Sequence, residues 1–326
     1  MPNQLAVFNP FTIGAVVYIM IKYKWSDIFE RSLYFMIIGF IGFFWATSCR
    51  GHVEPHWTVA ASIPMIILLY RRSLGNKKLT YFIKYWITAS IVLIIVARIA
   101  LIAEIFPQRL NFSGKEERNK AIESVVGDVP VVFTGSFQNP SNYSYFTKKE
   151  STVLSAINSR QTQFDIWAKE LDYQGKKVFI YGNYENRSKE YSVKGHTFHG
   201  YFTENFQSVN RTKIDYTLTA TEVVSGTVLR IPFEMLNPTN HIVDFNHPEF
   251  AVSCKAAYMI NRQLHYADCQ FDTPVGLIPV NGTIKGELTT VVPDIEPVNY
   301  TFTLTLVNHV CSAKSSSYQP IKIVSK

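Results

Sequence analysis

Long apolar runs are missing from the last two thirds of this 326-residue sequence. Four such runs lie at about 5–23, 33–48, 58–70 and 80–103, and none of comparable length follows. The helices predicted from these runs are 5–23, 31–48, 54–70 and 80–104. A helix needs about 20 mostly apolar residues to cross the hydrocarbon core of a membrane. The sequence therefore predicts an all-α transmembrane bundle of four helices over residues 1–107, followed by two exported domains.

The third run is too short to span a membrane by itself. It reaches spanning length only if its helix begins near Val53 or Glu54, which would draw polar residues toward the headgroups. Pro64 lies inside this run. Proline removes a helical hydrogen bond, so we expect a kink there, with neighbouring helices satisfying the freed carbonyl.

The features of a secretory signal peptide are also missing. No basic region precedes the first run, no small-residue cleavage site follows it, and three more apolar runs come after. An even number of spans places Met1 outside the cytoplasm. We interpret this as a chain whose natural beginning lies upstream; the alternative is a four-span protein with its N-terminus outside.

Positive charge is concentrated in the first 107 residues, where the formal net charge is +6, against +1 for the remainder. Cytoplasmic loops carry an excess of Lys and Arg. The loops after the first and third runs are therefore predicted to be cytoplasmic; they hold Lys22, Lys24 and Arg31, and Arg71, Arg72, Lys77 and Lys78. This basic character reports topology and gives no reason to expect a nucleic-acid partner.

Cysteine is scarce, with four residues in the chain. Cys254, Cys269 and Cys311 fall in the predicted exported part, where an oxidising compartment permits one disulfide and leaves one thiol over. A pair between Cys254 and Cys269 is compatible with adjacent strands, but spacing alone does not decide the pairing.

The predicted outer turn between the second and third helices is the most polar part of the membrane region. Its sequence is Arg50-Gly51-His52-Val53-Glu54-Pro55-His56-Trp57. Ionisable groups at membrane depth are costly, so such a cluster is a functional-site hypothesis.

Cations and hydrogen-bond donors at this surface suit a lipid-linked phosphate, because they stabilise the negative charge that grows on a departing phosphate. The candidate donors are Arg50, His52, His56 and Arg98. Glu54 has the chemistry of a general base, and we expect it to assist or to position the substrate or a histidine. Trp57 either stacks on the sugar or anchors at the headgroups.

Each of these residues also has a structural interpretation. Arg50 is explained as well by solvation or contact with a lipid phosphate as by a role in the site, and Arg98 is explained by its side chain reaching toward the headgroups. A metal site formed by His52 and His56 is disfavoured, since Pro55 prevents the regular helical face that ligands four residues apart would share. We therefore expect no metal and no cofactor.

The membrane region resembles a known enzyme family. The stretches Asn9-Pro10-Phe11, Ile41-Gly42-Phe43-Phe44 and residues 50–61 (RGHVEPHWTVAA) are similar to the later membrane helices of bacterial glycosyltransferase family 39. These are integral-membrane enzymes of the GT-C fold, similar to dolichyl-phosphate-mannose protein mannosyltransferases and to the aminoarabinose transferases that modify lipid A.

This resemblance implies transfer of a sugar from a polyprenyl-phosphate donor to a glycan, lipid or protein acceptor at the outer face of the cytoplasmic (inner) membrane. The family's acidic catalytic residues lie in an earlier outer loop, which has no counterpart in this chain. We therefore expect the C-terminal portion of a multi-pass transferase, and whether this chain alone is active stays open. The alternative is a non-catalytic, membrane-anchored scaffold that binds glycan or protein.

Residues 108–202 have the pattern of a small exported (periplasmic) α/β domain. Val129–Thr134 and Lys177–Tyr181 are predicted strands, and Gln161–Leu171 is a predicted helix. The loop at 135–138 follows a strand, where α/β sheets place ligands. It lacks a glycine-rich phosphate fingerprint, so a structural connector is the favoured interpretation.

Residues 203–326 are predicted to form an immunoglobulin-like β-sandwich. Apolar and polar residues alternate in short segments separated by Pro, Asn and Gly, as in sandwiches. The predicted strands are 214–222, 227–233, 251–260, 264–271, 282–292 and 299–307. Such modules bind sugars or partners through end loops, but spacer duty is equally compatible with the fold.

Overall fold

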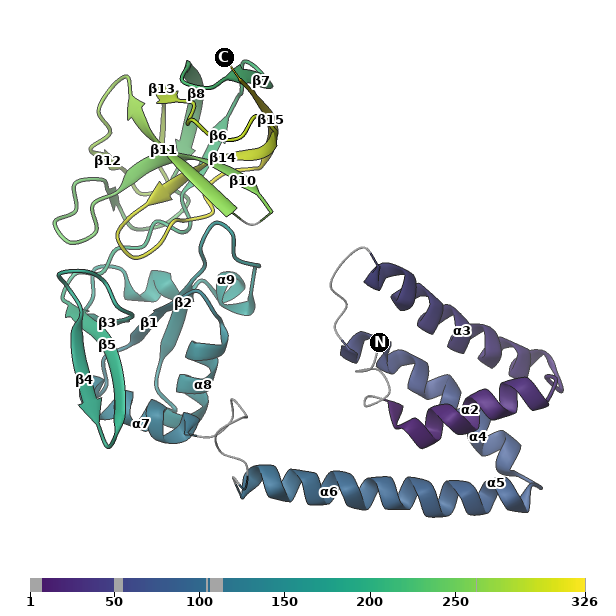
Figure 1. The fold of residues 1–326 in the computed structure, drawn as a ribbon. Helices are drawn as coiled ribbons and strands as arrows, with labels where there is room; N and C mark the ends of the chain where they lie inside the picture. The colour runs from purple at the N-terminus through teal and green to yellow at the C-terminus, as the bar shows by residue number, and fades with distance from the viewer. Residues whose placement is uncertain (1–7, 50–54, 104, 106–113, 262, 326) are drawn as a thin grey trace. The chain divides into compact units, whose positions relative to one another are not determined.

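The computed structural model describes residues 8–49, 55–103, 105, 114–261 and 263–325. The chain divides into two compact units, Met1–Ser113 and Gly114–Lys326, which are described separately (Figure 1).

The N-terminal unit is helical. Its elements are α2 (Pro10–Lys22), α3 (Ile28–Ser48), the 3-10 helix η1 (Pro55–Ala61), α4 (Ser62–Ser73), α5 (Lys77–Phe82), the π-helical turn η2 (Ile83–Ile87) and α6 (Thr88–Ile102). Within the described residues, two helices are long and apolar enough to cross a membrane, Ile28–Ser48 and the continuous Lys77–Ile102. They are compatible with membrane anchoring, whereas the predicted four-helix transmembrane bundle is not confirmed.

Two helices begin three residues earlier than predicted because polar side chains cap them. The Asp27 carboxylate accepts a hydrogen bond from the backbone N–H of Glu30 at 2.8 Å, which starts α3 at Ile28. The Asn76 side chain accepts from the N–H of Leu79 at 3.2 Å, which starts α5 at Lys77. Such caps satisfy backbone donors that the first turn of a helix leaves free.

The third apolar run does not form one uniform helix. It begins as η1 at Pro55 and becomes α-helical at Ser62, so Pro64 stands in the first turn of α4. A proline is tolerated there because its missing N–H would have no helical partner. The expected break is thus a change of helix type just before Pro64.

The apolar core of this unit lies between α2, α3 and α4. It includes the buried residues Ile19, Leu33, Ile37, Met65 and Leu68. By contrast, α6 buries only Ser90 among its 15 residues. Its apolar surface is therefore available to lipid or to another helix.

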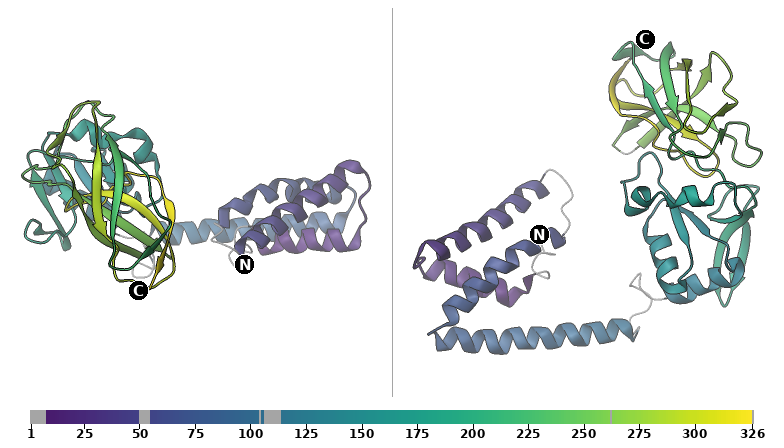
Figure 2. Two further views of the ribbon diagram at one scale, coloured as in Figure 1. Left: turned by 90° about the horizontal axis from the view of Figure 1, so that it is seen from above. Right: turned by 180° about the vertical axis from the view of Figure 1, so that it is seen from behind.

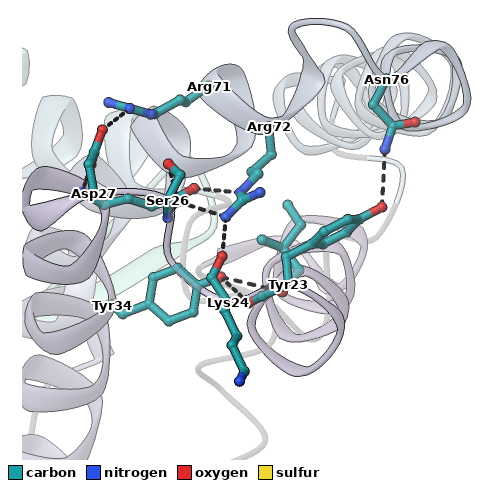
Figure 3. A network of polar contacts seen from close by, with 10 residues as sticks. Tyr23, Lys24, Ser26, Asp27, Tyr34, Arg71, Arg72 and Asn76 are labelled. Atoms are coloured by element: carbon teal, nitrogen blue, oxygen red, sulfur yellow. Dashed lines mark hydrogen bonds and ion pairs between the residues drawn. The ribbon is translucent and has the colours of Figure 1, made fainter.

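A buried ion pair fastens the opposite end of these helices from η1 (Figure 3). The Glu30 side chain is 1% exposed, and its Oε1 lies 2.5 Å from Arg72 Nε. Its Oε2 accepts from Arg72 at 2.6 Å and from the Ser26 hydroxyl at 2.8 Å. Arg72 also donates to the Lys24 carbonyl at 2.6 Å. The charge of Glu30 is thus paired with Arg72 of α4, and its Oε2 is hydrogen-bonded to the α2–α3 loop, whereas its Oε1 has the ion-pair contact but no hydrogen bond among the described residues.

These contacts bring the two basic loops to one end of the helices. Arg71 pairs with Asp27, and Arg72 reaches the loop at Lys24. The predicted topology requires the two loops to lie on the same side of the membrane, and this arrangement is compatible with that requirement.

The C-terminal unit opens with a five-stranded mixed sheet of order β2-β1-β3-β5-β4. The first three strands run parallel, β1 (Val131–Thr134), β2 (Ser151–Leu154) and β3 (Val178–Tyr181), while β5 (His196–Thr203) and β4 (Lys189–Val193) are antiparallel. The predicted strands at 129–134 and 177–181 are confirmed. The helices α7 (Lys115–Val126) and α8 (Gln138–Thr147) were not predicted.

Alternation along these strands produces two different cores. Val131, Phe133 and Phe179 face α7 and α8. Val132 and Ile180 face the other side, because successive side chains of a strand point to opposite faces. Both faces of the sheet are therefore covered.

The helix predicted over 161–171 is shorter and interrupted. It forms α9 (Gln163–Trp167), then stops at Ala168, which has a left-handed backbone (φ 55°), and continues as the 3-10 helix η3 (Lys169–Tyr173). A left-handed residue ends an α-helix, and alanine at this position gave no signal of it.

Eight of the remaining strands form one sheet that curls on itself (Figure 2), and the other two form a short separate pair. Its order is β6-β8-β13-β11-β10-β14-β15-β7. The strand β11 joins the two halves, because residues 263–268 pair with β10 and residues 269–271 pair with β13. The finer description as an immunoglobulin-like sandwich stays a prediction. The bounds are β6 (Lys213–Tyr216), β7 (Glu222–Val224), β8 (Val228–Leu236), β10 (Ser253–Ile260), β11 (Gln263–Phe271), β13 (Thr283–Val291), β14 (Asn299–Val307) and β15 (Gln319–Val324), with the short pair β9 (Val243–Asp244) and β12 (Leu277–Ile278).

The small mixed sheet and the curled sheet share a hydrophobic core. Val132, Leu154 and Ile180 of the former pack with Phe250 and Cys311, which lie in the segments that connect strands of the latter. A backbone bridge between Ala156 and Ala313 continues this contact. Residues 114–326 therefore form one compact body.

Loss of one partner of the Glu30–Arg72 pair is expected to destabilise the helical unit. Glu30→Ala leaves a guanidinium largely buried without its carboxylate, a cost on the order of 3 kcal/mol. The helical circular-dichroism signal of the detergent-solubilised protein should unfold at a clearly lower temperature. The control is Arg31→Ala, since Arg31 is exposed. An equal midpoint for both variants would contradict the clamp.

The strand register predicts one disulfide. Lys255 pairs with Asp268, which places Cys254 opposite Cys269, and a hydrogen bond to Cys269 together with burial raises the pKa of Cys254. Opposite residues of antiparallel strands have Cα atoms about 4.5–5.5 Å apart, within the disulfide range.

Oxidised glutathione should therefore form this bond by thiol–disulfide exchange: its S–S bond breaks, and the two electrons and two protons of the cysteine thiols pass to the two reduced glutathione molecules released. Differential alkylation and mass spectrometry should find Cys254 and Cys269 linked. Cys311 is the internal control, because its buried thiol donates to the Ser155 carbonyl at 3.6 Å and does not lie opposite a second cysteine in the strand register. Alkylatable Cys254 and Cys269 after oxidation would contradict the pairing.

Candidate functional site

The predicted polar turn lies between α3 and η1. Arg50, His52 and Glu54 fall outside the described residues, and so does the side chain of His56, although its backbone belongs to η1. The described part of the turn begins with Trp57.

Trp57 stands on the outer side of η1. Its side chain is 45% exposed, and its ring centroid is 6.4 Å from that of Phe44 on α3. The next residue, Thr58, is fully buried, as is Ala61. Residues 58 and 61 are one 3-10 turn apart, so they hold η1 against the bundle while Trp57 remains available.

Arg98 is exposed on α6. No hydrogen bond or ion pair links its guanidinium to another described residue. Both predicted roles of Arg98, reaching toward headgroups and binding a lipid phosphate, stay predictions, because residues 50–54 of the turn lie outside the described part of the chain.

An apolar cleft of about 490 Å³ lies between α2, α3 and α4. We call it the helix cleft. Trp45 and Gly42 mark the end of α3 that also carries Phe44, the ring neighbour of Trp57. Its lining residues are Ile13, Val16, Val17, Met20, Ile21, Ile37, Ile38, Ile41, Gly42, Trp45 and Met65.

The sequence analysis missed this cleft because its walls come from three separate helices, and their packing is not readable from periodicity. Gly42 is the one small residue of the lining, and small residues in membrane helices usually permit close helix packing. Instead it lines an open space, and no atom lies within 4 Å of the position of its missing Cβ.

Polar turn and helix cleft together suit an amphiphile. The cleft offers an apolar path, and the turn offers an indole at its described edge and ionisable side chains in its sequence. Largely apolar walls with a few convergent polar groups are typical of ligand sites. In the described residues, no group of three or more His, Cys, Asp and Glu side chains is placed to hold a metal ion.

The loop at 135–138 in the C-terminal unit is exposed, but the ligand position beside it is filled by a side chain. Ligands of open α/β sheets bind at the carboxyl ends of parallel strands, where the strand order reverses. Here that place, between β1 and β3, is occupied by Tyr184, whose hydroxyl lies 3.1 Å from that of Thr134. The ring centroid of His309 is 6.0 Å from that of Tyr184. This agrees with a structural connector.

His309 is held in its neutral form at this contact. Its Nε2 lies 2.6 Å from the Tyr201 hydroxyl. Loss of solvation, with a smaller contribution from Arg187, lowers the pKa of His309 to about 4, although Glu249 opposes the shift. Burial raises the pKa of Tyr201. Both groups therefore stay uncharged at neutral pH.

The depressed pKa of His309 predicts a pH-dependent stability. The unfolded imidazole takes up a proton near pH 6.5 and the folded one near pH 4, so its contribution is complete above pH 7 and is lost between pH 6.5 and 4. More than a third of the residue is exposed, and screening limits the loss to about 1 kcal/mol.

Urea unfolding of the full chain, followed by its β-sheet circular-dichroism signal at pH 7 and pH 5, measures this loss. His309→Gln should show a smaller difference between the two pH values than the parent chain. The same difference in both proteins would contradict the assignment.

No protein-family model matches the chain, and no curated protein matches it. Among solved structures, the cupredoxin domain of amoB from Nitrosocaldus yellowstonii is 17% identical with a TM-score of 0.24, over 36% of this chain and 88% of that one. The ASH/PapD-like domain 7 of human CEP192 is 11% identical with a TM-score of 0.17, over 38% of this chain and 91% of that one. Likenesses this weak carry no argument about function.

Proposed function

We propose that this chain is the C-terminal part of an integral-membrane glycosyltransferase of the family 39 type. It moves a sugar from a polyprenyl-phosphate donor to an acceptor at the outer face of the cytoplasmic membrane. The observation that supports this proposal is the helix cleft of about 490 Å³ at the end of α3 nearest the polar turn. An apolar path beside a cluster of cations matches an isoprenoid tail and its phosphate.

In this proposal the turn binds the headgroup. Arg50, His52 and His56 contact the phosphate and stabilise the charge that develops when the sugar leaves. Glu54 positions a histidine or the sugar, and Trp57 stacks on the ring. Arg98 on α6 contacts the lipid phosphate from the outer half of its helix.

The general base comes from elsewhere in this proposal, since the chain has no counterpart of the family's acidic loop. Further spans carrying that loop would find an unfilled apolar surface on α6, of which only Ser90 is buried. The exported unit, described at finer level as an α/β layer and an immunoglobulin-like sandwich, lies on the same outer side.

Substitutions in the turn test the function. In the complete protein, Glu54→Gln or His56→Ala should lower sugar transfer from a radiolabelled polyprenyl-phosphate sugar at least roughly tenfold, because each removes a positioned acid–base or charge-stabilising group. Expression should not change. Glu222→Gln and His265→Ala, in the curled sheet, are the matched controls.

Unchanged turnover in both turn variants would remove the turn from the mechanism. Topology provides a second refutation. Cys49 is exposed directly before the turn, so a membrane-impermeant maleimide should label it from the side that carries the exported unit. Labelling of Cys49 only from the cytoplasmic side would end the proposal.

A non-catalytic, membrane-anchored glycan-binding scaffold is the second candidate function. It is favoured by a cleft of about 380 Å³ in the C-terminal unit, whose lining is rich in hydroxyl and amide groups. Transfer activity of the complete protein separates the two candidates.

A further inference from the structure

A polar cleft of about 380 Å³ lies in the C-terminal unit, where the small mixed sheet meets the curled sheet. We call it the serine cleft. It opens at the carboxyl end of β2, and its size falls within the range of small-molecule sites, roughly 300–1,000 Å³. Its lining residues are Ser155, Ala156, Ser159, Gln161, Asp165, Asn210, Arg211, Lys213, Ile214, Asp215, Lys314, Ser315, Ser316 and Ser317.

The walls of the serine cleft are tied together by hydrogen bonds. The N–H of Ile157 donates to the Ser312 carbonyl at 2.8 Å, and the N–H of Ile214 donates to the Ser315 carbonyl at 2.7 Å. The Asn210 amide donates to the Ser155 carbonyl at 3.0 Å. Three chain segments far apart in sequence are thus fixed before any ligand arrives, which lowers the entropic cost of binding.

Two wall hydroxyls have no hydrogen-bond partner among the described residues. They belong to Ser155 and Ser315, which are 9% and 4% exposed. Thr212, between two lining residues, has a third such hydroxyl. Buried polar groups are nearly always paired in native proteins, but these oxygens have almost no accessible surface, so a ligand reaches them only after the side chains turn. The serines of the lining that are more open to the cleft are Ser159, Ser316 and Ser317.

The charges that face the wall are already balanced. Arg211 Nε lies 2.5 Å from Glu170 Oε1, and its NH1 donates to the Asp165 carbonyl at 2.6 Å. The Asp165 carboxylate accepts from the Thr162 N–H at 2.6 Å. These groups fix the wall and leave little unbalanced charge for an ionic ligand.

The mouth of the cleft carries charges of both signs. Lys213, Lys314 and Asp215 are exposed there, beside the amides of Gln161 and Asn210. Such a set donates and accepts hydrogen bonds in similar measure. It matches a neutral molecule whose hydroxyls do both, and it does not match an anion, which would require uncompensated cations.

We propose that the serine cleft binds a neutral, hydroxyl-rich oligosaccharide. Lys213, Lys314 and Asp215 contact the sugar hydroxyls at the mouth, and the serines meet the ring substituents deeper in. This site is separate from the polar turn and does not depend on transferase activity.

Saturation-transfer-difference NMR on the full chain in detergent tests the site. The probes are three neutral trisaccharides, mannotriose, cellotriose and triacetylchitotriose, with mannose 6-phosphate and glucuronic acid as anionic comparisons. At least one trisaccharide should receive saturation from the protein. Asp215→Ala should weaken its binding about tenfold, the effect of losing a hydrogen bond to a charged group.

Blocking variants locate the site. Ser317 is exposed in the lining, so the larger indole of Ser317→Trp should fill the cleft and abolish saturation of the trisaccharide without unfolding the chain. Ser141→Trp, at an exposed position of α8, is the matched control and should bind as the parent does.

Three results would overturn the proposal. The first is that no neutral trisaccharide receives saturation from the protein, which leaves water as the partner of the hydroxyls. The second is saturation of a trisaccharide that persists in Ser317→Trp. The third is saturation of the anionic sugars alone. Glu54→Gln should not alter this binding, so failure of the transferase proposal and failure of this one are distinguishable.

Discussion

The helical unit depends on pairing one carboxylate that is almost completely removed from solvent. Glu30 lies at the start of an apolar helix, and an unpaired charge there would be costly. Arg72 and Ser26 meet both of its oxygens, and this requirement draws α4 to the α2–α3 loop. With that end fixed, α3 and η1 meet at the other end, where Trp57 approaches Phe44. The position of Trp57, at the described edge of the polar turn, therefore depends on the pairing of Glu30 at the far end of the same helices.

A second constraint organises the C-terminal unit. The parallel strands are apolar on both faces, so two layers are needed to cover them. α7 and α8 cover one face, and segments of the curled sheet cover the other, with Phe250 and Cys311 in that contact. This second layer closes the usual ligand position between β1 and β3 with Tyr184 and His309. It also creates the serine cleft beside the end of β2, so the same packing removes one site and forms another.

Sequence patterns predicted the elements whose signals are local. The strands predicted at 251–260, 264–271 and 299–307 are confirmed by β10, β11 and β14, because alternation of apolar and polar residues is a local signal of a strand. Burial does not follow this alternation throughout, since Thr303 and Thr305 of β14 are also buried. The polar turn was also recognisable in the sequence, because its ionisable residues are nearly consecutive and lie between two apolar runs. Features that depend on contacts between distant segments were not predictable. The single curled sheet arises because β11 changes its partner strand along its length. The walls of both clefts come from three separate segments. The left-handed Ala168 had no sequence signature, and most residues of the turn lie outside the described part of the chain.

The bridge from Ala156 to Ala313 has a consequence for biogenesis. Residues that close the face of the first sheet emerge from the ribosome some time after that sheet, because the rate of synthesis is about 5–20 residues per second. Until they arrive, Val132, Leu154 and Ile180 have no cover. The earlier half of the C-terminal unit must then wait, incomplete and prone to aggregation, for a chaperone or for its own late strands to cover it.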